Sequence, residues 1–231
     1  MNYQYSYLLG DAVLLIIWFA LFFWRKNIRK EMIIISSLFG VAGIIAQFVY
    51  TADWWHPLTI TNTLVGIEDF IFGFSVGGIA SIIYEEVFKK RIRLRKASKK
   101  RELQEDKNFF LIGLSLAVIF FISFYFLKIN SFYSSILAFA IPLIYMWLKR
   151  KDLIYDSLAS GFLLMLVSFL AFIIPEFITP GWVQSAWYLE NLSGIIILKA
   201  PLEDIIWFFL AGAFIGPLYE FWKEGKLVKE K

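Results

Sequence analysis

Two adjacent carboxylic acids occur near the start of two different hydrophobic segments. Glu68-Asp69 lies in the stretch Gly-Ile-Glu-Asp-Phe-Ile-Phe, and Glu203-Asp204 lies in Pro-Leu-Glu-Asp-Ile-Ile-Trp. An Asp at the centre of a membrane helix costs roughly 2.5 to 3.5 kcal/mol on insertion scales. Because the chain carries such acids twice, at matching positions, we interpret Glu68, Asp69, Glu203 and Asp204 as catalytic residues.

Aromatic side chains follow both acidic pairs. The candidates for substrate contact are Phe72, Phe74, Trp207 and Phe208. Consecutive helical residues point about 100° apart, so one carboxyl of each pair can face the centre of a bundle while the other faces a flank. Burial among aromatic rings favours a protonated carboxyl, which can act as a general acid, and a second, ionised carboxyl can take a proton back. The alternative is that the acids stay hydrated at helix N-termini, where negative charge is favourable.

The composition is that of a membrane protein. The chain of 231 residues is 59% hydrophobic and 19% aromatic, whereas an average soluble domain is roughly 45 to 50% apolar. Apolar runs of about 20 residues, enough to cross a bilayer, are expected at 7–24, 32–50, 64–88, 109–127, 131–148, 153–174 and 201–222. We therefore predict an all-α membrane protein with seven transmembrane helices.

Basic residues alternate between the two sides of this arrangement. All Lys and Arg except Lys128 and Lys199 fall in the segments 25–30, 89–107, 149–151 and 223–231. Short basic loops stay in the cytoplasm, so we predict a multi-pass protein of the cell membrane with its N-terminus outside and its C-terminus inside. The net charge of +4 favours anionic lipid headgroups over nucleic acid as partners. The first apolar stretch is preceded by no basic residue and is expected to be a retained span.

An internal repeat is visible between residues 66–85 and 201–220. A shift of 135 positions aligns seven identical residues, among them both acids of each pair and Tyr84-Glu85 with Tyr219-Glu220. Such self-similarity indicates duplication. We predict two parallel three-helix repeats, 1–88 and 131–231, joined by 89–130, which holds a basic cytoplasmic loop or short surface helix and a linking span.

Several further residues have structural interpretations. Small residues four apart, in Gly73-Gly77-Ser81 and in Gly212-Gly216, permit close contact between helices. We interpret Tyr84-Glu85 and Tyr219-Glu220 as interface anchors and salt-bridging surface groups. Structural hydrogen bonding is expected for three polar residues within spans, Asp11, Gln47 and Asp156. The aromatic residues Trp54, Trp55, Trp182, Trp187 and Tyr188 are expected to form an external belt or to shape the mouth of a path for a lipid-soluble substrate.

The sequence excludes several classes of membrane protein. It has no cysteine, which excludes disulfides and thiolate metal sites. The single histidine, His56, cannot hold the iron of an oxygenase or desaturase, and residues 201–222 contain no lysine for a retinal Schiff base. No glycine-rich phosphate loop occurs. We therefore expect no flavin or nicotinamide, no other cofactor and no bound metal.

The two motifs together resemble the integral-membrane lycopene cyclase (carotenoid cyclase domain) family in its fused, two-repeat form. The similarity rests on Pro-Leu-Glu-Asp-Ile-Ile-Trp-Phe-Phe at 201–209, preceded by Trp187-Tyr188, and on the motif at 66–72, preceded by Trp54-Trp55. Each half in that family carries a Pro-x-Glu-Glu/Asp motif. The chain departs from it at Gly66, where proline is expected, and at Gly73.

The resemblance implies an isomerase that cyclises the end group of a linear, lipid-soluble polyene without net redox change. Transfer of the motif points to Glu68, Asp69, Glu203 and Asp204, with Pro201 setting the entry of the last helix. A proton is delivered to an alkene, aromatic faces stabilise the cation, exclusion of water protects it, and a carboxylate removes a proton. The alternatives are a carotenoid-binding or isoprenoid-binding protein, a proton-coupled carrier on the same scaffold, or a hydratase in which water captures the cation.

Overall fold

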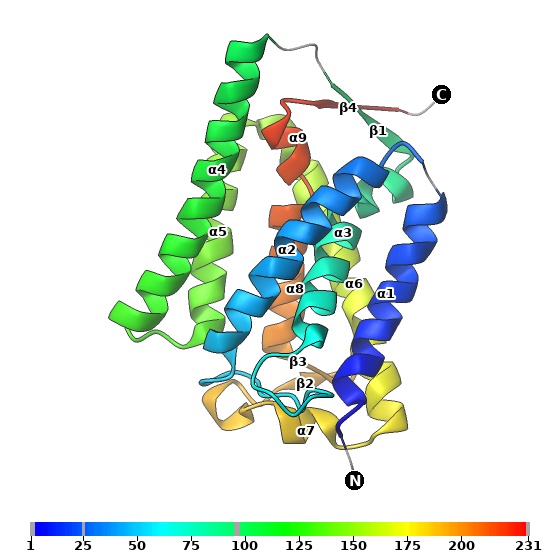
Figure 1. The fold of residues 1–231 in the computed structure, drawn as a ribbon, viewed down its shortest axis with the longest axis vertical. Coiled ribbons are helices and arrows are strands. Elements are labelled where there is room, and N and C mark those ends of the chain that lie inside the picture. The colour runs from blue at the N-terminus through cyan, green and yellow to red at the C-terminus, as the bar shows by residue number, and fades with distance from the viewer. Residues whose placement is uncertain (1–2, 25, 95–97, 230–231) are drawn as a thin grey trace.

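The computed structural model describes residues 3–24, 26–94 and 98–229 and is built almost entirely of helices (Figure 1). The long helices are α1 (Ser6–Trp24), α2 (Arg29–Tyr50), α3 (Ile67–Val87), α4 (Lys99–Phe121), α5 (Ser131–Lys149), α6 (Ile154–Ile178) and α8 (Leu202–Ile215). A π-helical turn, η1 (Ile122–Phe126), extends α4, the 3-10 turn η2 (Lys151–Leu153) precedes α6, and α9 (Leu218–Trp222) continues α8. Seven helical segments of the described chain are long and apolar enough to cross a membrane, which confirms the all-α expectation.

Short elements organise the two ends of the bundle. The loop between α6 and α8 contains α7 (Trp182–Ala186), the 3-10 turn η3 (Leu189–Asn191) and the strands β2 (Ile196–Ile197) and β3 (Ala200–Pro201), which form a hairpin. At the other end, β1 (Lys90–Arg93) pairs antiparallel with β4 (Lys226–Lys229). The segment expected as a basic loop or surface helix is therefore partly a strand. Its remainder includes the polar start of α4, which begins well before the apolar run.

Successive long helices alternate in direction (Figure 1). The helices α1, α3, α5 and α8 run away from the end that carries β2, β3 and α7, and α2, α4 and α6 run back toward it. We call this end the loop end and the opposite end, which carries β1, β4 and α9, the basic end. Both acidic pairs lie in the first turn of their helices, at the loop end.

The two halves use equivalent helix contacts. In the first half α3 packs against α2 and α1, and in the second half α8 packs against α6 and α5. Glycines make the tightest of these contacts: a Cβ at Gly73 would lie 2.2 Å from the carbonyl oxygen of Phe39, and one at Gly212 would lie 2.8 Å from that of Ser160. The close helix contact predicted from the glycine spacing is confirmed in both halves.

Replacement of Gly73 tests this contact. We expect Gly73→Ala to destabilise the protein by about 1 to 3 kcal/mol, because the added methyl group forces the α2 backbone away from α3. Thermal unfolding of the purified protein in detergent measures the effect. Gly113→Ala is the matched control, since no atom apart from the adjoining part of its own helix lies within 4 Å of the position of its Cβ. Equal melting temperatures for the two variants would contradict the prediction.

Candidate active site

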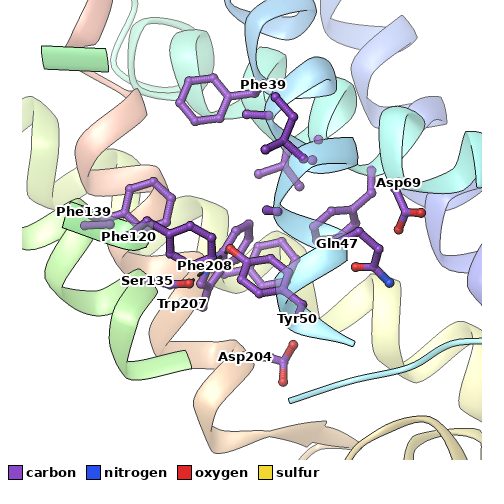
Figure 2. A pocket seen from close by; sticks show the side chains of 18 of the residues that line it. Phe39, Gln47, Tyr50, Asp69, Phe120, Ser135, Phe139, Asp204, Trp207 and Phe208 are labelled. Atoms are coloured by element: carbon purple, nitrogen blue, oxygen red, sulfur yellow. Dashed lines mark hydrogen bonds between the residues drawn. The ribbon is translucent and has the colours of Figure 1, made fainter. Parts of the chain in front are cut away.

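A cavity of about 390 Å³ lies between the two halves and is lined by residues of all seven long helices and both long loops. Its volume falls within the roughly 300 to 1,000 Å³ of ligand pockets. The walls are largely apolar and aromatic, with few polar groups. Figure 2 shows Asp69 of α3 and Asp204 of α8 at this cavity, with Tyr50 and Gln47 of α2 also directed toward it. One acid of each Glu-Asp pair thus reaches the same space.

Asp69 lies in the first turn of α3 and accepts two hydrogen bonds. Its Oδ1 accepts a hydrogen bond from the Tyr7 hydroxyl at 3.0 Å, and its Oδ2 accepts one from the backbone N–H of Gly66 at 2.7 Å. The second bond caps helix α3. The side chain of Asp69, in the first turn, accepts the backbone N–H of Gly66, the residue just before the helix. Both oxygens of Asp69 are therefore occupied.

Asp204 occupies the equivalent place on α8 with a different partner. Its Oδ2 accepts a hydrogen bond from the indole Nε1 of Trp187 at 2.8 Å. The residue that corresponds to Gly66 is Pro201, which has no backbone N–H to donate. The indole N–H of Trp54 also interacts with this carboxyl group, although outside the geometry of a hydrogen bond. The cap bond of the first half is thus missing from the second.

The glutamates of the two pairs are buried but turn away from the cavity. Oε1 of Glu68 accepts the backbone N–H of Ile60, and Oε1 of Glu203 accepts that of Ser193 at 2.7 Å. In each glutamate Oε2 is buried without a hydrogen bond to any described residue. Neither side chain lines the cavity. Each pair is therefore divided, with the Asp at the cavity and the Glu bonded to the loop before its helix.

The tryptophans of the two loops lie inside the protein. Trp55 and Trp187 form an isolated antiparallel bridge, in which His56 N–H donates to the Ala186 carbonyl at 2.7 Å and Tyr188 N–H donates to that of Trp54 at 2.9 Å. Trp54, Trp55, Trp182 and Trp187 are buried and line the cavity. The expectation of an external belt is wrong for these four residues, because the paired loops fold their indoles inward over the cavity.

A row of aromatic rings connects the two aspartates. Tyr7, which bonds Asp69, packs against Trp55 with ring centroids 4.7 Å apart, and Trp55 packs against Trp187, which bonds Asp204, at 5.2 Å. The predicted substrate contacts Phe72, Trp207 and Phe208 also line the cavity. Phe74 does not belong to the lining and packs instead against Trp18 at 4.9 Å.

Asp11 of α1 is a further acid at this site that the sequence analysis undervalued. It is buried, lines the cavity, and interacts electrostatically with Asp69 and Tyr7. Neither of its oxygens has a hydrogen-bond partner in the described chain, so the expected structural hydrogen bond is wrong for Asp11. Asp156 does form one, with Ser160 at 3.1 Å. The available signal for Asp11 was a lone acid in the second turn of an apolar span.

The fold and the cavity together define a multi-pass membrane protein with paired acids in an aromatic chamber. The family model described as lycopene cyclase matches residues 4–87 and 130–222, which is most of the chain. The chain therefore belongs to the lycopene cyclase family, and the two matched regions agree with the internal repeat. Comparison with curated proteins and with solved structures gives no match.

The hydrogen bond between Glu203 and the Ser193 amide predicts that Glu203 holds the second loop in place. We expect Glu203→Ala to increase the hydrogen-exchange rate of the Ser193 amide by roughly tenfold or more, because a hydrogen bond to a carboxylate contributes about 1.5 to 3 kcal/mol. Exchange measured by mass spectrometry on the loop peptide checks this. Glu190→Ala, an exposed acid in the same loop, is the control. Unchanged exchange in Glu203→Ala would show that this bond does not hold the loop.

Proposed function

We propose that the protein is a carotenoid cyclase that closes a ring at the end of a lycopene-type polyene by proton transfer, with no net redox change. The observation that carries the proposal is the placement of Asp69 and Asp204 in one apolar, aromatic cavity. Membership of the lycopene cyclase family supports a polyene as the substrate. An aromatic chamber suits such a substrate, because polyene end groups and carbocations both interact favourably with ring faces.

The hydrogen bonds support different roles for the two aspartates. A protonated carboxyl must donate its hydrogen, whereas a carboxylate only accepts. Asp69 meets donors at both oxygens, which matches the carboxylate, and we assign it as the base. Asp204 lacks the cap bond and can present a proton to the cavity from Oδ1, so we assign it as the acid. Glu68 and Glu203 act as positioning residues that fix the loops.

The reaction conserves atoms and electrons. Asp204 adds a proton to the terminal double bond of the end group and leaves a tertiary carbocation. A second double bond of the same chain attacks this cation, which forms the ring bond and moves the positive charge into the ring. Asp69 then removes a proton from an adjacent carbon, which gives a ring double bond and an isomer of the substrate. Return of the proton to Asp204 completes the cycle.

The route of the substrate follows from a difference between the two halves. Helix α1 packs closely against α6, whereas the equivalent pair, α5 and α2, makes few contacts. The cavity extends through this gap, where α4 supplies Phe109, Gly113 and Phe120 to its wall. A Cβ at Gly113 would touch nothing within 4 Å. We infer that the polyene enters from the bilayer between α2 and α4.

We also propose that the loop end faces the outside and the basic end the cytoplasm. Arg29, Lys90, Lys149 and Lys226 lie at the basic end, whereas Lys128 and Lys199 lie at the loop end. The division into repeats 1–88 and 131–231 with the linker 89–130 is supported by the two matched regions, which leave out α4.

Pigment analysis in cells that accumulate lycopene tests the acid and base roles. We expect ringed products from the native chain, and a decrease of at least about 100-fold in Asp204→Asn and Asp69→Asn, since a general acid or base contributes about 10² to 10⁴. The control Glu190→Gln changes an exposed acid of the second loop and should keep native yield. Unchanged lycopene with the native chain would favour the binding or carrier alternative, and full activity in Asp204→Asn would remove this residue from the mechanism.

A hydratase is the second candidate, because the cavity wall contains polar donors without partners. The indole N–H groups of Trp54, Trp182 and Trp207 and the amide nitrogen of Gln47 form no hydrogen bond within the described chain. A water held by such donors would capture the cation before proton loss. Hydroxylated products in the same pigment analysis would identify this reaction.

Filling the proposed entrance should block the substrate without altering the acids. We expect Gly113→Trp to lower the yield of ringed product strongly while the folded protein is still made, because the indole occupies the space between α2 and α4. Leu111→Trp is the matched control, since Leu111 is exposed on the same helix and does not line the cavity. Equal yields from the two variants would place the entrance elsewhere.

A further inference from the structure

A second group of acids lies at the basic end, away from the aspartates of the cavity. Glu31 of α2, Glu85 of α3 and Glu220 of α9 each place a carboxylate oxygen within 4.8 Å of the others. Their exposed fractions are 3%, 1% and 1%. The interpretation of Tyr84-Glu85 and Tyr219-Glu220 as surface groups is therefore wrong, because both pairs turn inward where the halves meet.

Two of these acids, Glu31 and Glu220, are buried without the partners that burial normally requires. Both carboxylate oxygens of Glu220, and Oε1 of Glu31, form no hydrogen bond with described residues, and neither side chain has an ion pair in that part of the chain. Arg150 lies near Glu220, but its guanidinium donates to the Asp152 carboxylate and to the backbone carbonyls of Glu220 and Gly225. An uncompensated buried charge costs several kcal/mol, so these carboxyl groups can be ionised together only if a positive charge joins them.

The neighbours of the group add negative charge. Asp156, in the first turn of α6, interacts electrostatically with Glu31 and Glu220. The phenol group of Tyr219 borders Glu31 and Glu220, and that of Tyr84 borders Asp156. Glu85 and Glu220 are equivalent in the repeat, and Glu31 and Asp156 each lie in the first turn of the second helix of their half. The four acids thus form a matched set across the two halves.

We propose that Glu31, Glu85 and Glu220 bind one hard divalent cation, such as Mg²⁺, Mn²⁺ or Ca²⁺. Carboxylate oxygens are the ligands of these ions, at about 2.0 to 2.6 Å, so opposite ligands lie at most about 5.2 Å apart. The oxygens within 4.8 Å of one another satisfy that limit. The donor set contains neither sulfur nor nitrogen, which disfavours zinc and copper. The cation joins α2 and α3 of the first half to α9 of the second.

Mn²⁺ binding to the purified, chelator-treated protein in detergent tests the proposal directly. We expect one Mn²⁺ per chain by electron paramagnetic resonance, displaced by Mg²⁺ or Ca²⁺, and a higher melting temperature with any of the three ions, since a ligand that binds only the folded state stabilises it. Affinity should fall at least about tenfold in Glu220→Gln and in Glu31→Gln, because loss of even an indirect partner of a metal has effects of this size.

One comparison checks that a variant folds, and a second variant checks that Mn²⁺ binding is specific to this site. Replacing one acid removes repulsion from the ion-free protein, so Glu220→Gln should fold and should melt at or above the temperature of the ion-free native chain. Glu102→Gln changes an exposed acid near the same end of the bundle and should bind Mn²⁺ as the native chain does. Absence of saturable Mn²⁺ binding to the native protein, or equal binding by Glu31→Gln, Glu220→Gln and the control, would overturn the proposal. These readouts are independent of cyclase activity.

Discussion

The cost of placing carboxyl groups inside a membrane protein determines what surrounds them. An acid in this environment must be neutral, hydrogen-bonded or paired with a cation. Glu68 and Glu203 are bonded to the backbone of their loops, and Asp69 and Asp204 are bonded to Tyr7 and Trp187. Because three of these partners, Ile60, Ser193 and Trp187, belong to loops, the loops have to fold back over the bundle. The Trp55–Trp187 bridge that closes the cavity is part of the same arrangement.

The two halves have diverged at the residue three positions before each aspartate, Gly66 in one and Pro201 in the other. Gly66 departs from the family motif, and the structure gives a physical reason: its N–H caps Asp69, and a Cβ there would lie 2.3 Å from Oε2 of Glu68. In the second half Pro201 removes that donor and leaves Asp204 with a single bond. One substitution at the helix entrance therefore changes how many hydrogen bonds the acid three residues later accepts. A duplicated motif can place two aspartates in different surroundings in this way.

Much of the fold was predictable from the sequence because membrane spans have a fixed length and composition. The seven spans and the glycine contacts follow from apolar runs and residue spacing, and both are confirmed. The direction of each side chain was not predictable, because the rotation of a helix depends on its neighbours. The sequence therefore did not reveal that the Asp of each pair faces the cavity, or that Glu85 and Glu220 point inward. The position of the tryptophans was also hidden, since composition cannot distinguish a lipid-facing loop from a folded cover.

Duplication alone does not explain the shape of the cavity. If the two halves packed identically, α5 would meet α2 as closely as α1 meets α6, and the acids would be enclosed on both sides. Instead the α5–α2 gap stays open, and α4, which has no counterpart in either repeat, lines it. Among the seven spans α4 is the least buried, so it can move with the smallest loss of contacts. For the proposed polyene substrate, the loosely packed wall is an entrance from the bilayer, and the closed packing of the opposite side helps to keep water from the proposed cation.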